Sequence, residues 1–151
     1  MKNKIVTVIL FIVVVAVTVY IVVTKDDRFY LSDEYYNNGS FSEITSEQID
    51  GLSNKKYILY TYNNYCSFAT PCDKIFQTFS NDYKIDILSI NYEQFKNTSF
   101  NKIVKYAPSV MIISNNKVVA YLDAENDRDV EKYQNVDAFK EWLEKYIYLE
   151  K

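Results

Sequence analysis

The hydrophobic and polar positions of the chain divide it into a long apolar segment, a polar stretch and a region of short periodic elements. Residues 5–23 form the apolar segment, IVTVILFIVVVAVTVYIVV, which contains no charged residue. A helix of about 20 apolar residues spans the hydrocarbon core of a bilayer. A cleaved signal peptide has a shorter apolar region and a small-residue cleavage site, and neither is seen here. We therefore predict an uncleaved transmembrane helix; the alternative is a buried helix of a soluble protein.

The charges beside this segment predict its orientation. Lys2 and Lys4 precede it, whereas Lys25 and Arg28 follow it. With the initial amine, the two leading lysines favour the N-terminus on the cytoplasmic side under the positive-inside rule. The rest of the chain would then lie outside the cytoplasm. We expect a single-pass protein of the cell membrane with an extracytoplasmic C-terminal domain, a location in which disulfides persist.

The pattern predicts three parts: a membrane anchor over 1–24, a linker over 25–40 and a folded domain over 41–151. The linker sequence, KDDRFYLSDEYYNNGS, is polar and aromatic without a clear period. After it, segments with the periods of helices and strands follow one another closely. Hydrophobic residues make up 48% of the chain, which is enough to build a core.

The strands of the domain are predicted from short runs of β-branched and aromatic residues. YILYTY at 57–62 is such a run, YKIDILSI at 83–90 alternates between apolar and polar residues, and VMII at 110–113 is fully apolar. The last strand, 118–122, pairs with the third across Asn115-Asn116, because asparagine tolerates the positive φ of a tight turn.

The helices are predicted over four segments, of which the first is about 45–52, where Thr45 to Gln48 form a capping box. The other three are 71–79, 93–104 and 135–148. Phe95, Phe100, Ile103 and Val104 should point inward from the third, and Phe139, Trp142, Leu143, Tyr146 and Ile147 from the fourth. The order (β)αβαβαββα predicts an α/β fold with a mixed central sheet flanked by helices.

The two cysteines of the chain, Cys66 and Cys72, are separated by five residues, in a chain that has no histidine. Pro71 favours the start of a helix. Cys72 would then face the core with Ile75, Phe76 and Phe79, whereas Cys66 would lie in the preceding loop. Five intervening residues allow the Cβ atoms to approach to the ~3.8 Å of a disulfide. The pair could exchange, form a static disulfide, or leave Cys72 as a small core residue.

Residues 41–149 resemble the thioredoxin fold in the succession of their elements. In thioredoxin-like proteins, an aromatic–cysteine pair ends the first long strand and Pro-Cys begins the next helix. Tyr65-Cys66 and Pro71-Cys72 occupy these places. The resemblance therefore implies catalytic roles for Cys66 and Cys72 and a substrate contact for Tyr65.

A third motif of this resemblance lies in YAPSVMII, residues 106–113. Here Ala107 and Pro108 stand where the family has a cis-proline loop, which holds the backbone of a bound peptide. The resemblance implies that both residues bind substrate and that the Pro108 peptide bond is cis. The chain is also similar to membrane-anchored thioredoxin-like proteins of Gram-positive bacteria, among them the bacteriocin accessory proteins.

Two departures from the thioredoxin pattern affect the predicted chemistry. The family motif is C-x-x-C, and here three more residues stand between the cysteines. The buried acid of many thioredoxins falls, counting back from Cys66, on Tyr60. In addition, the carboxylate of Asp73 disfavours a second negative charge in the same helical turn.

Charge and ligand types exclude several other functions. The net charge of −3 and the absence of a basic stripe argue against nucleic-acid binding. Two cysteines without histidine give too few soft ligands for zinc, so we expect no metal and no cofactor. The sequence favours a membrane-tethered thiol–disulfide oxidoreductase that acts on the thiols or disulfides of exported proteins and peptides. It does not identify the redox partner. The alternative is a redox-inactive binding module in which Cys66 and Cys72 form a structural disulfide.

Overall fold

The computed structural model describes most of the region after the apolar segment; the described residues are 11, 13–15, 26–63, 71–123 and 125–151. Most of the predicted anchor, 5–23, lies outside them. Phe11 and residues 13–15 are helical and exposed. Within the described part of the chain, no helix is long and apolar enough to cross a membrane.

The core of the domain is a five-stranded mixed sheet, as the element order predicts. Its strands are β1 (Phe41–Glu43), β2 (Lys56–Tyr62), β3 (Ile87–Asn91), β4 (Ser109–Ser114) and β5 (Lys117–Asp123). They lie in the order β1-β3-β2-β4-β5. The first three are parallel, and β4 and β5 are antiparallel to their neighbours. Both faces of β3 are covered, so its residues 87–90 are buried, as are residues 57–61 of β2.

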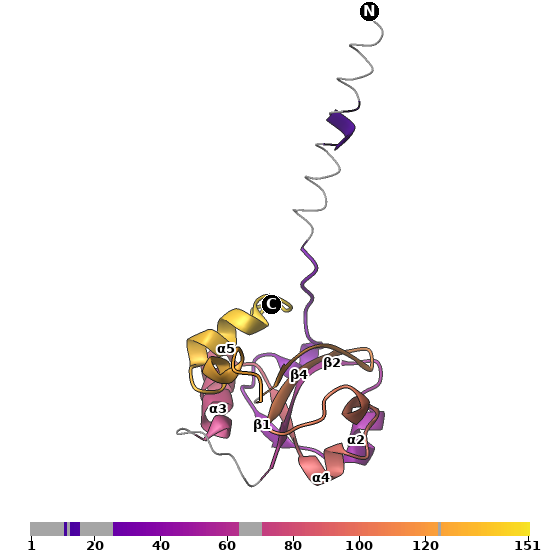
Figure 1. Ribbon diagram of the computed structural model, residues 1–151, viewed down its shortest axis with the longest axis vertical. Coiled ribbons are helices and arrows are strands. Elements are labelled where there is room, and N and C mark those ends of the chain that lie inside the picture. Colours follow the sequence, from indigo (N-terminus) through magenta and orange to yellow (C-terminus); the bar gives the residue numbers. More distant parts are fainter. Residues whose placement is uncertain (1–10, 12, 16–25, 64–70, 124) are drawn as a thin grey trace, which may run out of the picture.

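Helices cover both faces of the sheet (Figure 1). They are α2 (Ser46–Asp50), α3 (Cys72–Tyr83), α4 (Tyr92–Phe95) and α5 (Val136–Leu143), with 3₁₀ turns η1 (Asp33–Tyr35), η2 (Ser99–Lys102) and η3 (Val130–Tyr133). Figure 1 shows α3 and α5 on one face and α2 and α4 on the other. Phe139 of α5 packs between Phe76 and Phe79 of α3, with ring centroids 4.8 and 5.0 Å apart.

The second strand of the sequence prediction was placed too early. Residues 83–90 were expected to be extended, but α3 continues to Tyr83 and β3 begins at Ile87. The Tyr83 ring stacks on Phe79 at 4.9 Å, which adds a turn to the helix, and Lys84 ends it in a left-handed conformation. The hairpin prediction is confirmed: Asn115 and Asn116 have φ values of 49° and 60°.

Two predicted helices are shorter than expected. The segment 93–104 is divided into α4 and η2, because the Thr98 hydroxyl and amide both donate to the Phe95 carbonyl and so end the first turn. Phe95, Phe100 and Val104 are buried as predicted, but Ile103 is 53% exposed rather than inward. The final helix ends at Leu143 instead of 148.

The end of the chain and the predicted linker lie side by side. Phe29 forms a parallel bridge with Ile147, in which the Phe29 amide donates to the Tyr146 carbonyl and the Tyr148 amide donates to the Phe29 carbonyl, both at 3.1 Å. Part of the segment 25–40 therefore packs on the domain. Three of its side chains belong to the core: Leu31, Tyr35 and Tyr36.

Candidate functional site

The candidate site lies at the edge of the sheet where the three parallel strands end. Glu43 ends β1, Asn91 ends β3, and Asn63 follows β2. The antiparallel strand β4 starts at the same edge, because Ser109 pairs with Thr61 near the end of β2. In parallel sheets, the carboxyl ends of the strands are the usual place for a functional site.

Cys72 is placed at this edge by the first turn of α3. The helix begins at Cys72 with Pro71 as its N-cap residue, one position later than the sequence predicts. Cys72 is 1% exposed and lies in the core with Phe76 and Phe79, as the helical spacing predicts. Asp73, the next residue, is exposed. The predicted site residues Cys66 and Tyr65 lie outside the described residues.

The loop before β4 carries the other predicted substrate contacts. The peptide bond between Ala107 and Pro108 is cis, as the resemblance implies. The Asn63 side-chain amide donates to the Ala107 carbonyl at 2.9 Å, and the Ser109 hydroxyl donates to the Tyr106 carbonyl at 2.7 Å. Asn63, which follows β2, and Ser109 of β4 therefore fix the loop at the same edge as Cys72. Sequence reasoning did not identify Asn63.

Tyr133 of η3 contacts this loop from the core of the domain. Its side chain is fully buried, and its hydroxyl donates to the Leu122 carbonyl at 2.7 Å, with the Pro108 carbonyl as a second, more distant acceptor of the same hydrogen at 3.2 Å. Burial, and next the negative charge that Cys72 can carry, raise the pKa of Tyr133 well above its usual value. Sequence reasoning missed Tyr133, because no local pattern connects η3 with the loop before β4.

Tyr60 is the residue at which the resemblance, counted back from Cys66, places the buried acid of many thioredoxins. It is 4% exposed, and its ring meets the edge of Phe76 at 4.9 Å. Among the residues that the structure describes, the buried polar side chains other than tyrosine are hydroxyls: Thr61, Ser80, Ser89 and Ser109. In this part of the chain, then, no carboxylate is buried beneath the cysteine.

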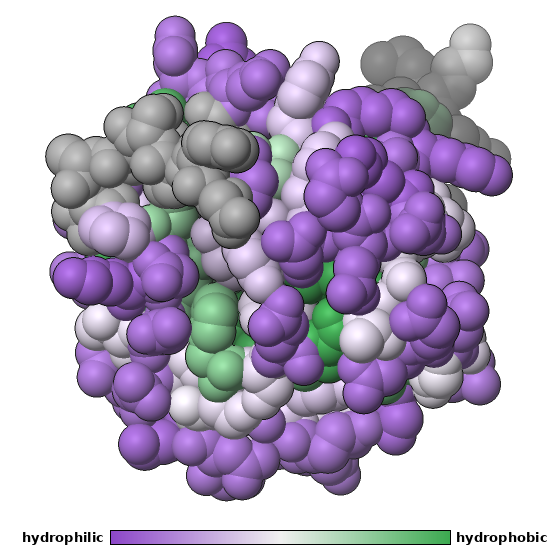
Figure 2. Space-filling model, turned by 90° about the horizontal axis from the view of Figure 1, so that it is seen from below, coloured by the Kyte–Doolittle hydropathy of each residue, from purple (hydrophilic) through white to green (hydrophobic). Residues whose placement is uncertain are grey.

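A cleft of about 460 Å³ opens beside Cys72. Its lining comprises aromatic Phe41, Tyr60 and Tyr62, polar Asn63 and Ser89, acidic Glu43 and Asp73, and Cys72 itself. The Tyr62 hydroxyl donates to the Glu43 carboxylate, and this bond raises the pKa of Tyr62. Figure 2 views the domain from this end and shows apolar and weakly polar side chains at the centre, surrounded by hydrophilic ones.

The described residues contain no group of three or more cysteine, aspartate or glutamate side chains placed to hold a metal ion.

Among the predicted site residues, the structure brings together Cys72, Ala107 and Pro108. It adds Asn63, Tyr133 and the acidic cleft to them.

Comparison with solved structures identifies the architecture. A candidate oxidoreductase with a thioredoxin fold superimposes with a TM-score of 0.52 at 15% identity, over 68% of this chain and 93% of that one. The chain has a thioredoxin-like fold. The reduced thioredoxin pre-protein of Schistosoma mansoni (TM-score 0.48, 15% identity, 72% and 99% of the two chains) and the long form of spinach chloroplast thioredoxin f (0.45, 18%, 65% and 87%) are more distant in shape.

At these identities the similarity establishes the thioredoxin-like fold and leaves the activity to the site itself. No family model matches the sequence, and no match was found among curated proteins.

Proposed function

We propose that the protein is a membrane-tethered, extracytoplasmic thiol–disulfide oxidoreductase that acts on exported proteins through Cys66 and Cys72. The observation that carries the proposal is the position of Cys72, buried in the first turn of α3 at the same sheet edge as the cis-Pro108 loop. A resolving cysteine needs such a place, shielded from solvent yet next to a cleft. The narrower similarity to anchored thioredoxin-like proteins of Gram-positive bacteria belongs to the same proposal.

The reaction exchanges one disulfide for another. The Cys66 thiolate attacks a substrate disulfide, forms a mixed disulfide and releases one substrate thiolate, which takes up a proton. The Cys72 thiolate then attacks the Cys66 sulfur and releases the second substrate thiol. The substrate gains two electrons and two protons, and Cys66 and Cys72 become a disulfide, which an external dithiol must reduce before the next cycle. With an oxidant as partner, the same steps run in reverse.

Tyr60 favours a second function, a redox-inactive binding module with a structural Cys66–Cys72 disulfide. An aromatic ring stands where an acid would assist proton transfer, so the fold would be retained for binding alone. In this case the cleft and the Pro108 loop would bind a peptide without exchange.

The reduction potential of the Cys66–Cys72 pair distinguishes these functions. The full-length protein in detergent micelles is equilibrated with glutathione buffers, and its free thiols are counted after alkylation. A potential between about −120 and −270 mV, the range of exchange enzymes, supports the oxidoreductase. A potential below about −300 mV identifies a structural disulfide and refutes it. Cys72→Ala should then accumulate mixed disulfides only in the first case, with Cys66→Ala as the control.

A further inference from the structure

The cleft beside Cys72 combines acidic groups with aromatic walls. Glu43 and Asp73 are exposed, whereas Phe41 and Tyr62 are half-buried and Cys72 is buried. The carboxylates therefore lie at the rim, the rings form the walls, and the sulfur is at the floor. The volume of about 460 Å³ is within the range of ligand pockets and is sufficient for one long side chain.

Among the residues that the structure describes, no lysine or arginine neutralises the negative charge of this cleft. Other carboxylates of the described residues do form ion pairs with lysine or arginine, among them Asp26, Asp33, Glu34, Glu93, Asp129 and Glu144. Within the described part of the chain, Glu43 and Asp73 have no basic partner, and no lysine or arginine lines the cleft. Residues 64–70, which follow β2, contain no charged residue in their sequence. Among the described residues, then, these two carboxylates are left available to a cation of a bound molecule.

The Glu43 carboxylate is also held in place. The Tyr62 hydroxyl donates to one of its oxygens across the cleft. The strands that carry Glu43 and Tyr62, β1 and β2, are fixed relative to each other through β3. Glu43 of β1 pairs with Ser89 of β3, and Ser89 pairs with Tyr60 of β2. A carboxylate oriented by a neighbour loses less conformational entropy when it binds a cation than a freely rotating one does.

We propose that this cleft receives the side chain of a lysine or arginine that neighbours the target cysteine of an exported polypeptide. The inference rests on the proposed function, because it specifies the substrate on which Cys66 and Cys72 would act. The cationic head pairs with Glu43 and Asp73, and the aromatic walls add cation–π attraction and cover the aliphatic stem.

Recognition of a basic residue would also favour the exchange itself. A cation next to a cysteine stabilises its thiolate, and a more stable thiolate leaves a disulfide faster. The cleft would therefore select target disulfides whose leaving sulfur is already activated. The charge complementarity also steers basic targets toward an acidic protein whose net charge is −3.

The test measures binding without any exchange. Reduced full-length protein in detergent micelles is titrated with fluorescein-labelled, cysteine-free peptides that differ at one residue: lysine, arginine, norleucine or glutamate. Fluorescence anisotropy gives the dissociation constants. We expect the lysine and arginine peptides to bind about tenfold more tightly than the norleucine peptide, the size of a charge pair strengthened by aromatic contacts. The preference should weaken as salt is raised.

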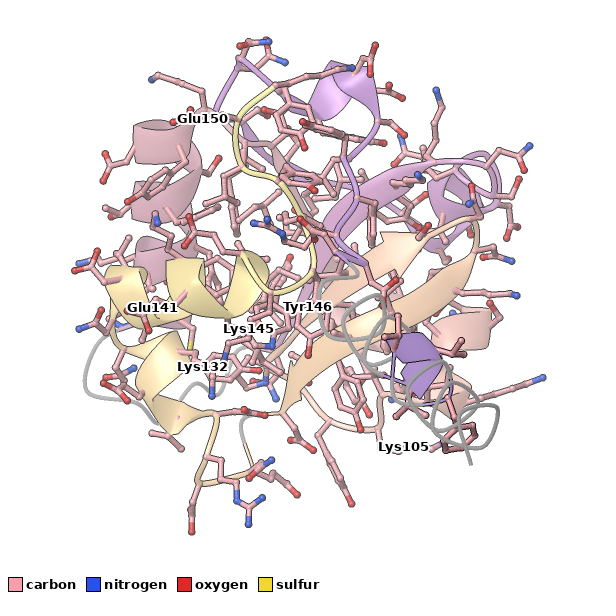
Figure 3. All side chains as sticks on the ribbon, turned by 90° about the horizontal axis from the view of Figure 1, so that it is seen from above. Lys105, Lys132, Glu141, Lys145, Tyr146 and Glu150 are labelled. Carbon is pink, nitrogen blue, oxygen red and sulfur yellow. The ribbon has the colours of Figure 1, made fainter. Side chains whose placement is uncertain are left out.

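Glu43→Gln should remove most of this preference, and Asp73→Asn should reduce it independently. The matched control is Glu141→Gln, an exposed carboxylate on α5 that does not line the cleft (Figure 3). It should leave the preference unchanged. Circular dichroism shows whether each variant is folded. If Glu43→Gln does not fold, Asp73→Asn alone still tests the proposal.

Equal affinity for the basic and norleucine peptides would overturn the proposal. Disulfide-containing versions of the same peptides are then assayed for exchange. Exchange that proceeds equally with all of them refutes the basic-residue site and leaves the oxidoreductase standing. Charge preference without exchange supports the cleft and refutes the oxidoreductase. A Glu43→Gln variant that slows exchange of every peptide equally, with binding unchanged, would assign Glu43 to proton transfer and also overturn the proposal.

Discussion

Tyr133→Phe removes one oxygen atom from beneath the candidate site and nothing else. The hydroxyl donates its hydrogen to the Leu122 carbonyl and lies within 3.2 Å of the Pro108 carbonyl, so it connects the end of β5 with the loop that precedes β4. The ring remains in the core, where its edge faces Phe76 at 5.8 Å. The substitution therefore tests the hydrogen bonds without creating a cavity.

The expected cost follows from the burial of these groups. A hydroxyl has one hydrogen, so the stronger bond, at 2.7 Å to Leu122, contributes about 1 kcal/mol. Its loss also leaves a buried carbonyl short of a donor, which adds about 1 kcal/mol or more. We expect the free energy of unfolding to fall by about 2 kcal/mol. With a urea m-value of about 2 kcal/mol/M, the midpoint falls by about 1 M.

Urea unfolding followed by circular dichroism measures this change. The control is Tyr121→Phe, the same chemical substitution at a side chain that is 40% exposed on β5. It should change the stability by less than about 0.5 kcal/mol. If Tyr133→Phe also stays within that margin at an unchanged m-value, the hydroxyl does not fix the Pro108 loop and the reasoning fails.

Three further predictions concern the rest of the domain. Gly39→Ala should lower the free energy of unfolding by about 2 kcal/mol in the same urea assay, because Gly39 has a φ of 71° and an added Cβ would lie 2.7 Å from a carbonyl oxygen of α3. The control is Gly51→Ala: Gly51 has a right-handed conformation, so this change should alter the free energy of unfolding by less than about 0.5 kcal/mol. Burial raises the pKa of Tyr133, so its contribution to stability should be complete below pH ~10, the unfolded value, and should be lost above it. Other buried tyrosines contribute in the same direction, so the measurable quantity is a difference: above pH ~10 the wild type should lose about 1.4 kcal/mol per pH unit more than Tyr133→Phe does. A protein that lacks residues 1–40 should melt at a much lower temperature than one that lacks residues 1–25. The longer deletion removes three more buried side chains, Leu31, Tyr35 and Tyr36, each of which contributes about 2 kcal/mol. Equal melting temperatures would contradict the packing of the predicted linker on the domain.

The sequence predicted the sheet better than it predicted the helices. The strands β2, β4 and β5 are runs of β-branched and aromatic residues whose local pattern agrees with their tertiary role. The boundary between α3 and β3 could not be placed, because the ring of Tyr83 stacks on Phe79 and this contact is visible only in the folded chain. The split of residues 93–104 likewise depends on one hydroxyl, Thr98, which competes for a backbone carbonyl.

The candidate site was predictable only where the helical period or a motif identified it. Cys72 and Pro108 were found in this way, and the structure places both at the same edge of the sheet. Asn63, Tyr133 and Glu43 were not found, because each acts across a strand pair or a loop, at a sequence distance that no local pattern records. Cys66 lies outside the described residues, so its role stays a prediction.

The position of Tyr60 explains why the charges of this site lie at its rim. The ring contacts Phe76 of α3, at 4.9 Å, and Phe41 of β1, at 5.9 Å, and so joins three elements of the core. An ionised carboxylate at this position would be surrounded by rings and would lose its hydration without a partner. Tyr60 therefore packs in the core at this position. The carboxylates of Glu43 and Asp73 lie at the exposed rim, where they stay hydrated and can be charged without a large desolvation penalty. Charge at a rim acts first on what approaches from solvent, so this arrangement is better suited to choosing a substrate than to moving a proton beneath Cys72.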